Sequence, residues 1–158
     1  MKRHAMLSAP VLVALLLIAG GCTPPGPEGA GPSVVHAGSL AAQMHVPAGT
    51  VRSGQVMGIS ITTWNLGEDP IPVTRTTSNV YHVDVARHDG IGWVTFRTYP
   101  ATEAIMLRHL TLEPDSRRED TVNVRVEPDW PAGEVVRLQA VMNGRAELRM
   151  GGFVTVRP

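Results

Sequence analysis

Histidine and carboxylate side chains at metal-ligand spacing are the first candidates for chemistry in this sequence. His82 and Asp84 are two residues apart in an alternating segment, so both would project from the same face of a strand and could hold a metal together. A structural or catalytic zinc site needs three or four protein ligands, however, and no further ligand can be assigned without assuming the register of other strands. We therefore interpret the pair as part of a polar outer face, and we predict no metal site and no cofactor.

Soft ligands suggest a second metal hypothesis, because exported copper carriers use methionine and histidine side chains. The candidates are Met44, His45, Met57, Met106 and His109. The His-x-Met pairing of small copper-binding domains is absent, and Met57 lies on the apolar side of an alternating segment, where methionine usually fills space in a core. A periplasmic copper carrier is kept as an alternative function.

Motifs for enzymatic catalysis are missing from the sequence. It has no Gly-x-Ser-x-Gly, no phosphate-binding loop, no His-Glu-x-x-His, and no lysine after Lys2 that could assist a serine nucleophile. We therefore expect a protein that is not an enzyme.

Tryptophan and arginine are the residue types that most often anchor protein contacts. Trp130 falls in an expected loop, which makes it our candidate for a partner-binding tryptophan. Trp64 and Trp93 are expected to cover the ends of the domain instead. Arg117 and Arg118 fall in an expected turn and would suit a trypsin-like protease, although a solvated charged turn is the common alternative.

The N-terminus has the organisation of an export signal. Lys2 and Arg3 precede an apolar run at 11–18, and small residues follow up to Cys22. The run is shorter than the ~20 residues that a membrane-spanning helix needs. The segment resembles a bacterial lipobox, with Ala19 at the position that leucine usually occupies. This resemblance implies cleavage before Cys22 and lipid on its thiol.

Cleavage at Cys22 would place the mature protein in a bacterial cell envelope, on the outer side of the cytoplasmic membrane or on the outer membrane. A secreted protein with a chance cysteine is the alternative. Cys22 is the single cysteine, so no internal disulfide can form and the fold depends on a hydrophobic core. After cleavage the chain has twelve arginines, no lysine and fourteen acidic residues. This near-neutral charge argues against nucleic-acid binding.

Composition divides the chain into a signal peptide at 1–21, a stalk at 22–38 and a domain at 39–158. The stalk begins with the lipidated cysteine and is rich in proline and glycine, so it cannot bury enough apolar surface to offset its ordering entropy. The remaining residues are enough for one domain with a real core.

Short runs rich in β-branched residues, separated by turn residues every eight to twelve positions, predict an all-β domain. Apolar and polar residues alternate most clearly at 57–63, 121–126 and 136–142, as in strands with one buried face. Asn143 and Gly144 predict a tight hairpin turn. About eight such strands predict an antiparallel two-sheet sandwich, with a small closed barrel as the alternative.

The order of these strands and turns resembles that of the BsuPI family, the intracellular proteinase inhibitor domain. The similar pieces lie within 55–144 and comprise a strand ending at 61–65 before a Gly-Glu-Asp-Pro turn, a tyrosine-centred strand at 81–85 before an Asp-Gly turn and Trp93, and the segments at 110–114 and 129–133. Asp115 departs from the pattern, because the family usually has glycine there. The resemblance implies an immunoglobulin-like sandwich and a protease as partner, but no residue here matches a reactive site.

These observations together predict a protein-binding lipoprotein of the bacterial envelope, with proteinase inhibition as the form that the resemblance implies. Its expected contacts are the membrane, through lipid on Cys22, and a protein partner. The alternatives are the copper carrier and a structural or assembly lipoprotein.

Overall fold

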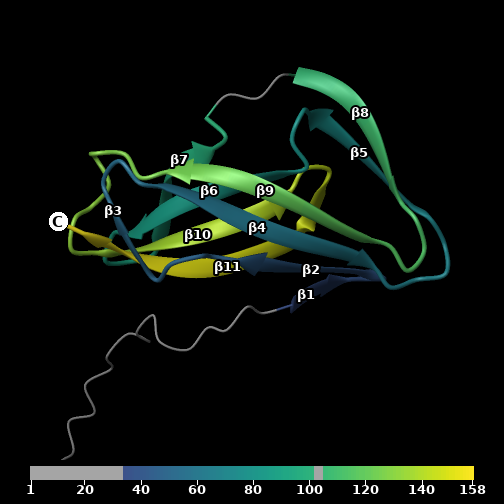
Figure 1. Ribbon diagram of the computed structural model, residues 1–158, viewed down its shortest axis with the longest axis horizontal. Helices are drawn as coiled ribbons and strands as arrows, with labels where there is room; N and C mark the ends of the chain where they lie inside the picture. Colours follow the sequence, from purple (N-terminus) through teal and green to yellow (C-terminus); the bar gives the residue numbers. More distant parts are fainter. Residues whose placement is uncertain (1–33, 102–104) are drawn as a thin grey trace, which may run out of the picture.

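The computed structural model describes residues 34–101 and 105–158, and every regular element in these ranges is a β-strand (Figure 1). The strands are β1 (Val34–Ala37), β2 (Leu40–His45), β3 (Thr50–Arg52), β4 (Val56–Asn65), β5 (Ile71–Thr77), β6 (Tyr81–His88), β7 (Trp93–Tyr99), β8 (Ile105–Leu112), β9 (Arg117–Arg125), β10 (Val135–Met142) and β11 (Arg145–Arg157). The predicted all-β class is confirmed. No helix in the described ranges is long and apolar enough to cross a bilayer.

Two sheets pack face to face around one hydrophobic core, which confirms the immunoglobulin-like sandwich. The first sheet has the order β1-β2-β4-β9, and the second has the order β3-β11-β10-β6-β7. A separate two-stranded ribbon, formed by β5 and β8, runs from the end of β4 and the start of β9 toward the start of β6 (Figure 1).

The strand inventory differs from the expectation in two respects. The described residues form eleven strands rather than about eight, and β3 pairs with β11 in parallel rather than antiparallel. β3 has three residues and β1 has four, so neither strand exceeds the four positions that are the minimum for recognising a period of two.

The described part of the sandwich extends back to Val34, before the expected domain boundary at residue 39. β1 pairs with β2 along its whole length, and Val35 and Ala37 pack against the core. The last part of the expected stalk therefore belongs to the sandwich. The expected signal peptide at 1–21, Cys22 and the rest of the stalk lie outside the described residues.

The predicted turn between β10 and β11 is confirmed, since Met142 pairs with Arg145 across Asn143 and Gly144. Gly144 has φ +86°, and a Cβ at this position would overlap the carbonyl oxygen of Thr74 on the ribbon. Both the backbone conformation and the close approach of the ribbon therefore require glycine.

Asn65 fixes the base of the ribbon. Its side-chain amide donates to the carbonyl oxygens of Asp69 (2.8 Å) and Leu112 (2.9 Å), and its side-chain oxygen accepts from the Gly67 N–H (3.0 Å). Asn65 is fully buried, so each of these bonds also satisfies a group that water cannot reach. The end of β4, the following turn and the end of β8 are thereby held together.

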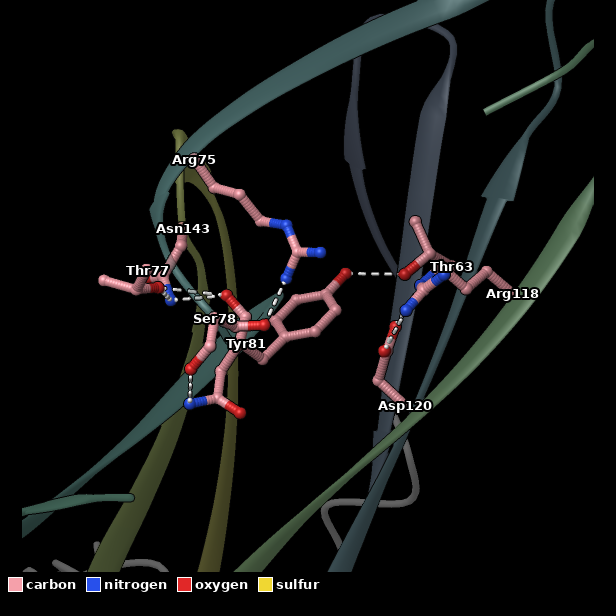
Figure 2. A network of polar contacts seen from close by, with 9 residues as sticks. Thr63, Arg75, Thr77, Ser78, Tyr81, Arg118, Asp120 and Asn143 are labelled. Atoms are coloured by element: carbon pink, nitrogen blue, oxygen red, sulfur yellow. Dashed lines mark hydrogen bonds and ion pairs between the residues drawn. The ribbon is translucent and has the colours of Figure 1, made fainter. Parts of the chain in front are cut away.

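A hydrogen bond between hydroxyl groups links the two sheets inside the core. The hydroxyls of Tyr81 on β6 and Thr63 on β4 are 2.6 Å apart, and both side chains are buried (Figure 2). Burial raises the pKa of Tyr81 from 10.0 to about 12, although the Thr63 hydroxyl acts in the opposite direction. Removal of the tyrosine proton inside the sandwich is therefore unfavourable.

Stability should consequently decrease at alkaline pH. Unfolded tyrosine ionises near pH 10 and folded Tyr81 near pH 12, so the unfolded state releases its proton first. The free energy of unfolding should be unaffected below pH 10 and should fall by roughly 2 to 3 kcal/mol as the pH rises to 12. Urea unfolding at a series of pH values measures this fall, and Tyr81→Phe should remove most of it. An equal fall in Tyr81→Phe would assign the effect to another group.

Candidate functional site

An aromatic patch lies on the outer face of the second sheet. We define it as His88, Trp93, Arg137 and Phe153 on the sheet, together with Ile91 on the hairpin between β6 and β7. His88 pairs with Trp93 between β6 and β7, and Arg137 pairs with Phe153 between β10 and β11. The chain neighbours of Arg137 and one neighbour of Phe153 are buried in the core, namely Val136, Leu138 and Val154. Because successive side chains of a strand point to opposite faces, Arg137 and Phe153 point away from the core.

Trp93 is the centre of the patch. Its ring centroid lies 5.4 Å from that of His88 and 5.5 Å from that of Phe153, and the guanidinium carbon of Arg137 lies 5.3 Å from it. The indole therefore reaches from the edge strand β7 across β6 and β10. Ala86, on the outer face of β6, is only 1% exposed, as expected if these large side chains cover it. The expectation that Trp93 covers an end of the sandwich is therefore wrong.

The apolar part of the patch is accessible to a partner. Ile91 is 96% exposed at the tip of the β6–β7 hairpin, and Phe153 is 37% exposed. Contiguous apolar side chains bordered by polar ones often mark interaction sites, and tryptophan and arginine are enriched among the residues that dominate binding energy. Because Trp93 is already packed between its neighbours, binding would cost it little conformational entropy.

The hairpin that carries Ile91 has a defined conformation. The carboxylate of Asp89 accepts hydrogen bonds from the backbone N–H groups of Ile91 (2.9 Å) and Gly92 (2.8 Å). The bonds from Gly92 and Ile91 hold the pKa of Asp89 below its usual value, since they favour the ionised form. Gly90 supplies the positive φ of +96° that the turn requires. Ile91 is thus presented to solvent by a bonded turn.

Trp130, the tryptophan predicted to contact a partner, is 3% exposed and belongs to the core. Its backbone N–H donates to the Glu127 carbonyl oxygen (3.1 Å), and its ring packs edge-on against Phe96 with centroids 6.0 Å apart. The residue does lie in a connecting segment, but the turn directs the indole inward. The expectation of an exposed contact residue is therefore wrong.

Arg117 and Arg118 are also placed differently from the expectation. They begin β9 instead of lying in a turn, and they pair with Trp64 and Thr63 of β4. Arg117 forms an ion pair with Glu119. A protease would need this backbone free and extended, whereas here it is part of a sheet.

Arg118 has a structural explanation. Its guanidinium donates two hydrogen bonds to the carboxylate of Asp120, at 2.8 and 2.7 Å (Figure 2). Both residues alternate in step with the buried Val122 and Val124, so they face the inner side of an edge strand. Inward-facing charges are a known means of preventing one sheet edge from pairing with another molecule.

The proposed copper ligands are not assembled in the structure. Met44 and Met57 are 4% and 1% exposed in the core, whereas His45 and His109 are exposed. The Met106 side chain lies outside the described residues. In the described part of the chain, no three histidine, cysteine or carboxylate side chains gather as a metal-ligand set.

His82 and Asp84 do lie on one face, as their spacing predicted. Their side chains point from β6 to the outside of the second sheet, and His82 Nε2 lies 3.9 Å from Asp84 Oδ2. They occupy the same face as the aromatic patch, further along β6 from His88.

No family profile matches the chain, and no curated protein matches it. Among solved structures, a β-glucosidase from Listeria innocua in complex with gluconolactone has 10% identity and a TM-score of 0.49, covering 75% of this chain and 16% of its own. The sporulation control protein Spo0M from Bacillus subtilis has 8% identity and a TM-score of 0.47, covering 77% of this chain and 51% of its own.

A CARDB domain from Pyrococcus furiosus, in complex with di-metal ions, has 13% identity and a TM-score of 0.40, covering 79% of this chain and 88% of its own. Similarity of this degree carries no conclusion about the function of this chain.

Proposed function

We propose that this protein is a lipoprotein of the bacterial envelope, anchored by lipid on Cys22, whose sandwich domain binds a protein partner through the aromatic patch. The observation that carries the proposal is the contact of half-buried Trp93 with Phe153 and Arg137 on the outer sheet face, with the exposed Ile91 on the adjoining hairpin. A sheet face places these side chains more firmly than a long loop would, so the partner would meet a surface already in its binding conformation.

The sequence supports an extracytoplasmic location for this binding. The n-region, apolar run and small residues before Cys22 have the order of a lipoprotein signal. A diacylglycerol and a further acyl chain would hold the protein at the membrane stably, whereas a single chain binds only reversibly.

Proteinase inhibition is the narrower hypothesis that the BsuPI resemblance implies. The two segments expected to contact a protease are not exposed loops, because Trp130 is buried and the arginine pair lies in a strand. We therefore place the proposed contact at the aromatic patch and leave the class of partner protein to experiment.

Substitutions in the patch should abolish partner binding without unfolding the domain. Ile91→Asp is the sharpest variant, since its side chain is 96% exposed and has no folding role. Trp93→Ala removes the centre of the stack. We expect Trp93→Ala to weaken binding at least tenfold, because central aromatic contacts contribute about 2 kcal/mol or more. We expect a loss of about tenfold from Ile91→Asp, because it places a charge against an apolar contact. The readout is quantitative mass spectrometry of envelope proteins retained by the immobilised protein.

Leu66→Asp and Leu107→Asp are matched controls, because both leucines are exposed (58% and 67%) and lie outside the patch. The same partner should be retained by both controls. Retention by Ile91→Asp and Trp93→Ala at the level of the controls would refute the patch as the binding site.

A further inference from the structure

Four arginine side chains on the outer face of the second sheet lie outside the ion pairs of the described residues. They are Arg52 on β3, Arg137 on β10, and Arg149 and Arg157 on β11. Each follows a buried residue of its strand, so alternation directs it away from the core. The ion pairs in the described ranges that contain an arginine use other ones, namely Arg97, Arg117, Arg118 and Arg145.

Carboxylates on the same face do not compensate these charges. Asp84 Oδ2 lies 3.9 Å from His82 Nε2, and Glu147 Oε1 lies 3.4 Å from Arg145 Nη1, so both already have partners. Asp89, beside the patch, accepts hydrogen bonds from N–H groups of its own hairpin. The sequence expected after cleavage has fourteen acidic residues and twelve arginines, so the excess of arginine is a property of this face and not of the whole chain.

Arg137 is the arginine at the centre of the aromatic patch. Its guanidinium carbon lies 5.3 Å from the centroid of the Trp93 ring. Its Nε is buried without a hydrogen-bond partner, and no acceptor among the described residues is bonded to its terminal nitrogens. A guanidinium stacked on an aromatic ring is restrained in orientation, and its planar fork of N–H groups matches the two oxygens of a carboxylate. Arg137 is therefore a preorganised receptor for one carboxylate.

Arg149 and Arg157 extend the basic surface to both sides of Phe153. Each lies four residues from Phe153 on the outer side of β11, which corresponds to about 13 Å along the strand. A Cβ at Gly151, between Arg149 and Phe153, would contact nothing within 4 Å, so the surface is open there. Arg52 pairs with Arg157 on the neighbouring strand, and like charges side by side are unfavourable. A carboxylate near this pair would relieve the repulsion.

We infer that the partner bound by the aromatic patch presents an acidic surface, with one carboxylate on the Arg137 guanidinium and apolar side chains against Ile91 and Phe153. The inference rests on the proposed function, because it specifies the chemistry of the partner at the same surface. Hydrogen bonds between a guanidinium and a carboxylate are stronger than bonds between neutral groups. Arginines around the contact would also speed association with an acidic protein.

The spacing of the arginines favours the carboxylates of a protein over a phosphate group. A phosphate concentrates its charge at one point, where several cations would have to converge on it. Arg149 and Arg157 instead lie about 13 Å along the strand on either side of Phe153, which pairs with Arg137. Carboxylates interspersed with apolar side chains on a polypeptide match this arrangement, so the occupant that fits is an acidic protein segment.

Fluorescence anisotropy with a synthetic peptide tests the inference. The probe is a fluorescein-labelled peptide of Glu-Glu-Leu-Ser repeats, its control has glutamine in place of every glutamate, and the protein is the full chain in non-ionic detergent. We expect the acidic peptide to bind at least tenfold more tightly than the control peptide. Arg137→Gln should weaken that binding at least tenfold through loss of charged hydrogen bonds. Arg137→Lys keeps the charge without the planar fork, so it should recover only part of the binding.

Arg125→Gln is the matched control variant, because Arg125 is exposed on the outer face of the first sheet and its substitution removes the same charge. It should bind the acidic peptide as the unmodified protein does. Equal loss of binding in Arg125→Gln and Arg137→Gln would overturn the inference, and so would equal binding of the two peptides.

Failure of this inference is distinguishable from failure of the proposed function. If the acidic peptide does not bind while Ile91→Asp and Trp93→Ala still weaken retention of an envelope protein, the partner is not acidic and the proposed function stands. Unchanged retention by those two variants would refute the proposed function and the inference with it. Binding to phosphatidylglycerol vesicles that depends on Arg137, without binding to the peptide, would overturn the inference by assigning the face to a membrane.

Discussion

Val124→Asp is expected to unfold the domain, whereas Arg125→Asp should leave it folded. Val124 is fully buried on β9, opposite Met57 of β4, and it faces the core between the two sheets. An unpaired carboxylate at this place costs several kcal/mol, which is a large part of a typical stability of about 5 to 15 kcal/mol. Arg125 is the next residue and points to solvent, so a charge is tolerated there.

Thermal unfolding of the two variants, followed by circular dichroism, measures the difference. The substitutions introduce the same side chain one residue apart, which makes each the control for the other. A similar shift of the melting temperature in both would contradict the assignment of buried and exposed faces in β9.

Cys22→Ala should abolish stable attachment to the membrane. The thiol of Cys22 is the proposed acceptor of the diacylglycerol, and its loss leaves no position for lipid because it is the only cysteine. We expect uncleaved precursor or soluble protein in place of a lipid-anchored mature form. Fractionation of cells, with mass spectrometry of the N-terminal peptide, distinguishes these forms.

A matched variant, Ala19→Leu, restores the residue usual at this position of the lipobox and should be processed at least as well as the unmodified chain. Normal cleavage and unchanged membrane attachment of Cys22→Ala would show that lipid on this residue does not anchor the protein.

Local patterns in the sequence were sufficient to predict the fold class and several of its strands. Val122 and Val124 alternate with polar residues and do face the core, and the turn at Asn143 and Gly144 forms as predicted. These features depend on residues close together in the chain, where the two-residue period of a strand and the preference for positive φ act directly.

The aromatic patch could not be predicted in the same way. Trp93 and Phe153 are sixty residues apart and lie on strands separated by β6 and β10, so their contact follows from strand order and register. No local pattern encodes that order. The Asp-Gly turn before Ile91 was recognisable from the sequence, but no local pattern showed beside which face of which sheet this turn would lie.

The two errors at predicted contact residues have a common cause. A proline and two acidic residues come just before Trp130, and this composition is typical of an exposed loop. The ring of Trp130 nevertheless packs beside Phe96. Arg117 and Arg118 have the composition of a charged turn, but in the structure they pair with β4 as part of a sheet. In both cases tertiary packing overrides the local preference, and a single sequence does not report it.

Photo-crosslinking from position 91 in intact cells tests the central claim most directly. A p-benzoylphenylalanine replacing Ile91 would lie at the edge of the aromatic patch, and the same group replacing Leu107 would lie on the ribbon, outside the patch. We predict a discrete adduct with one envelope protein from position 91, lost when Trp93→Ala is added, and no such adduct from position 107. Absence of an adduct from position 91, or the same adduct from both positions, would contradict binding at the patch.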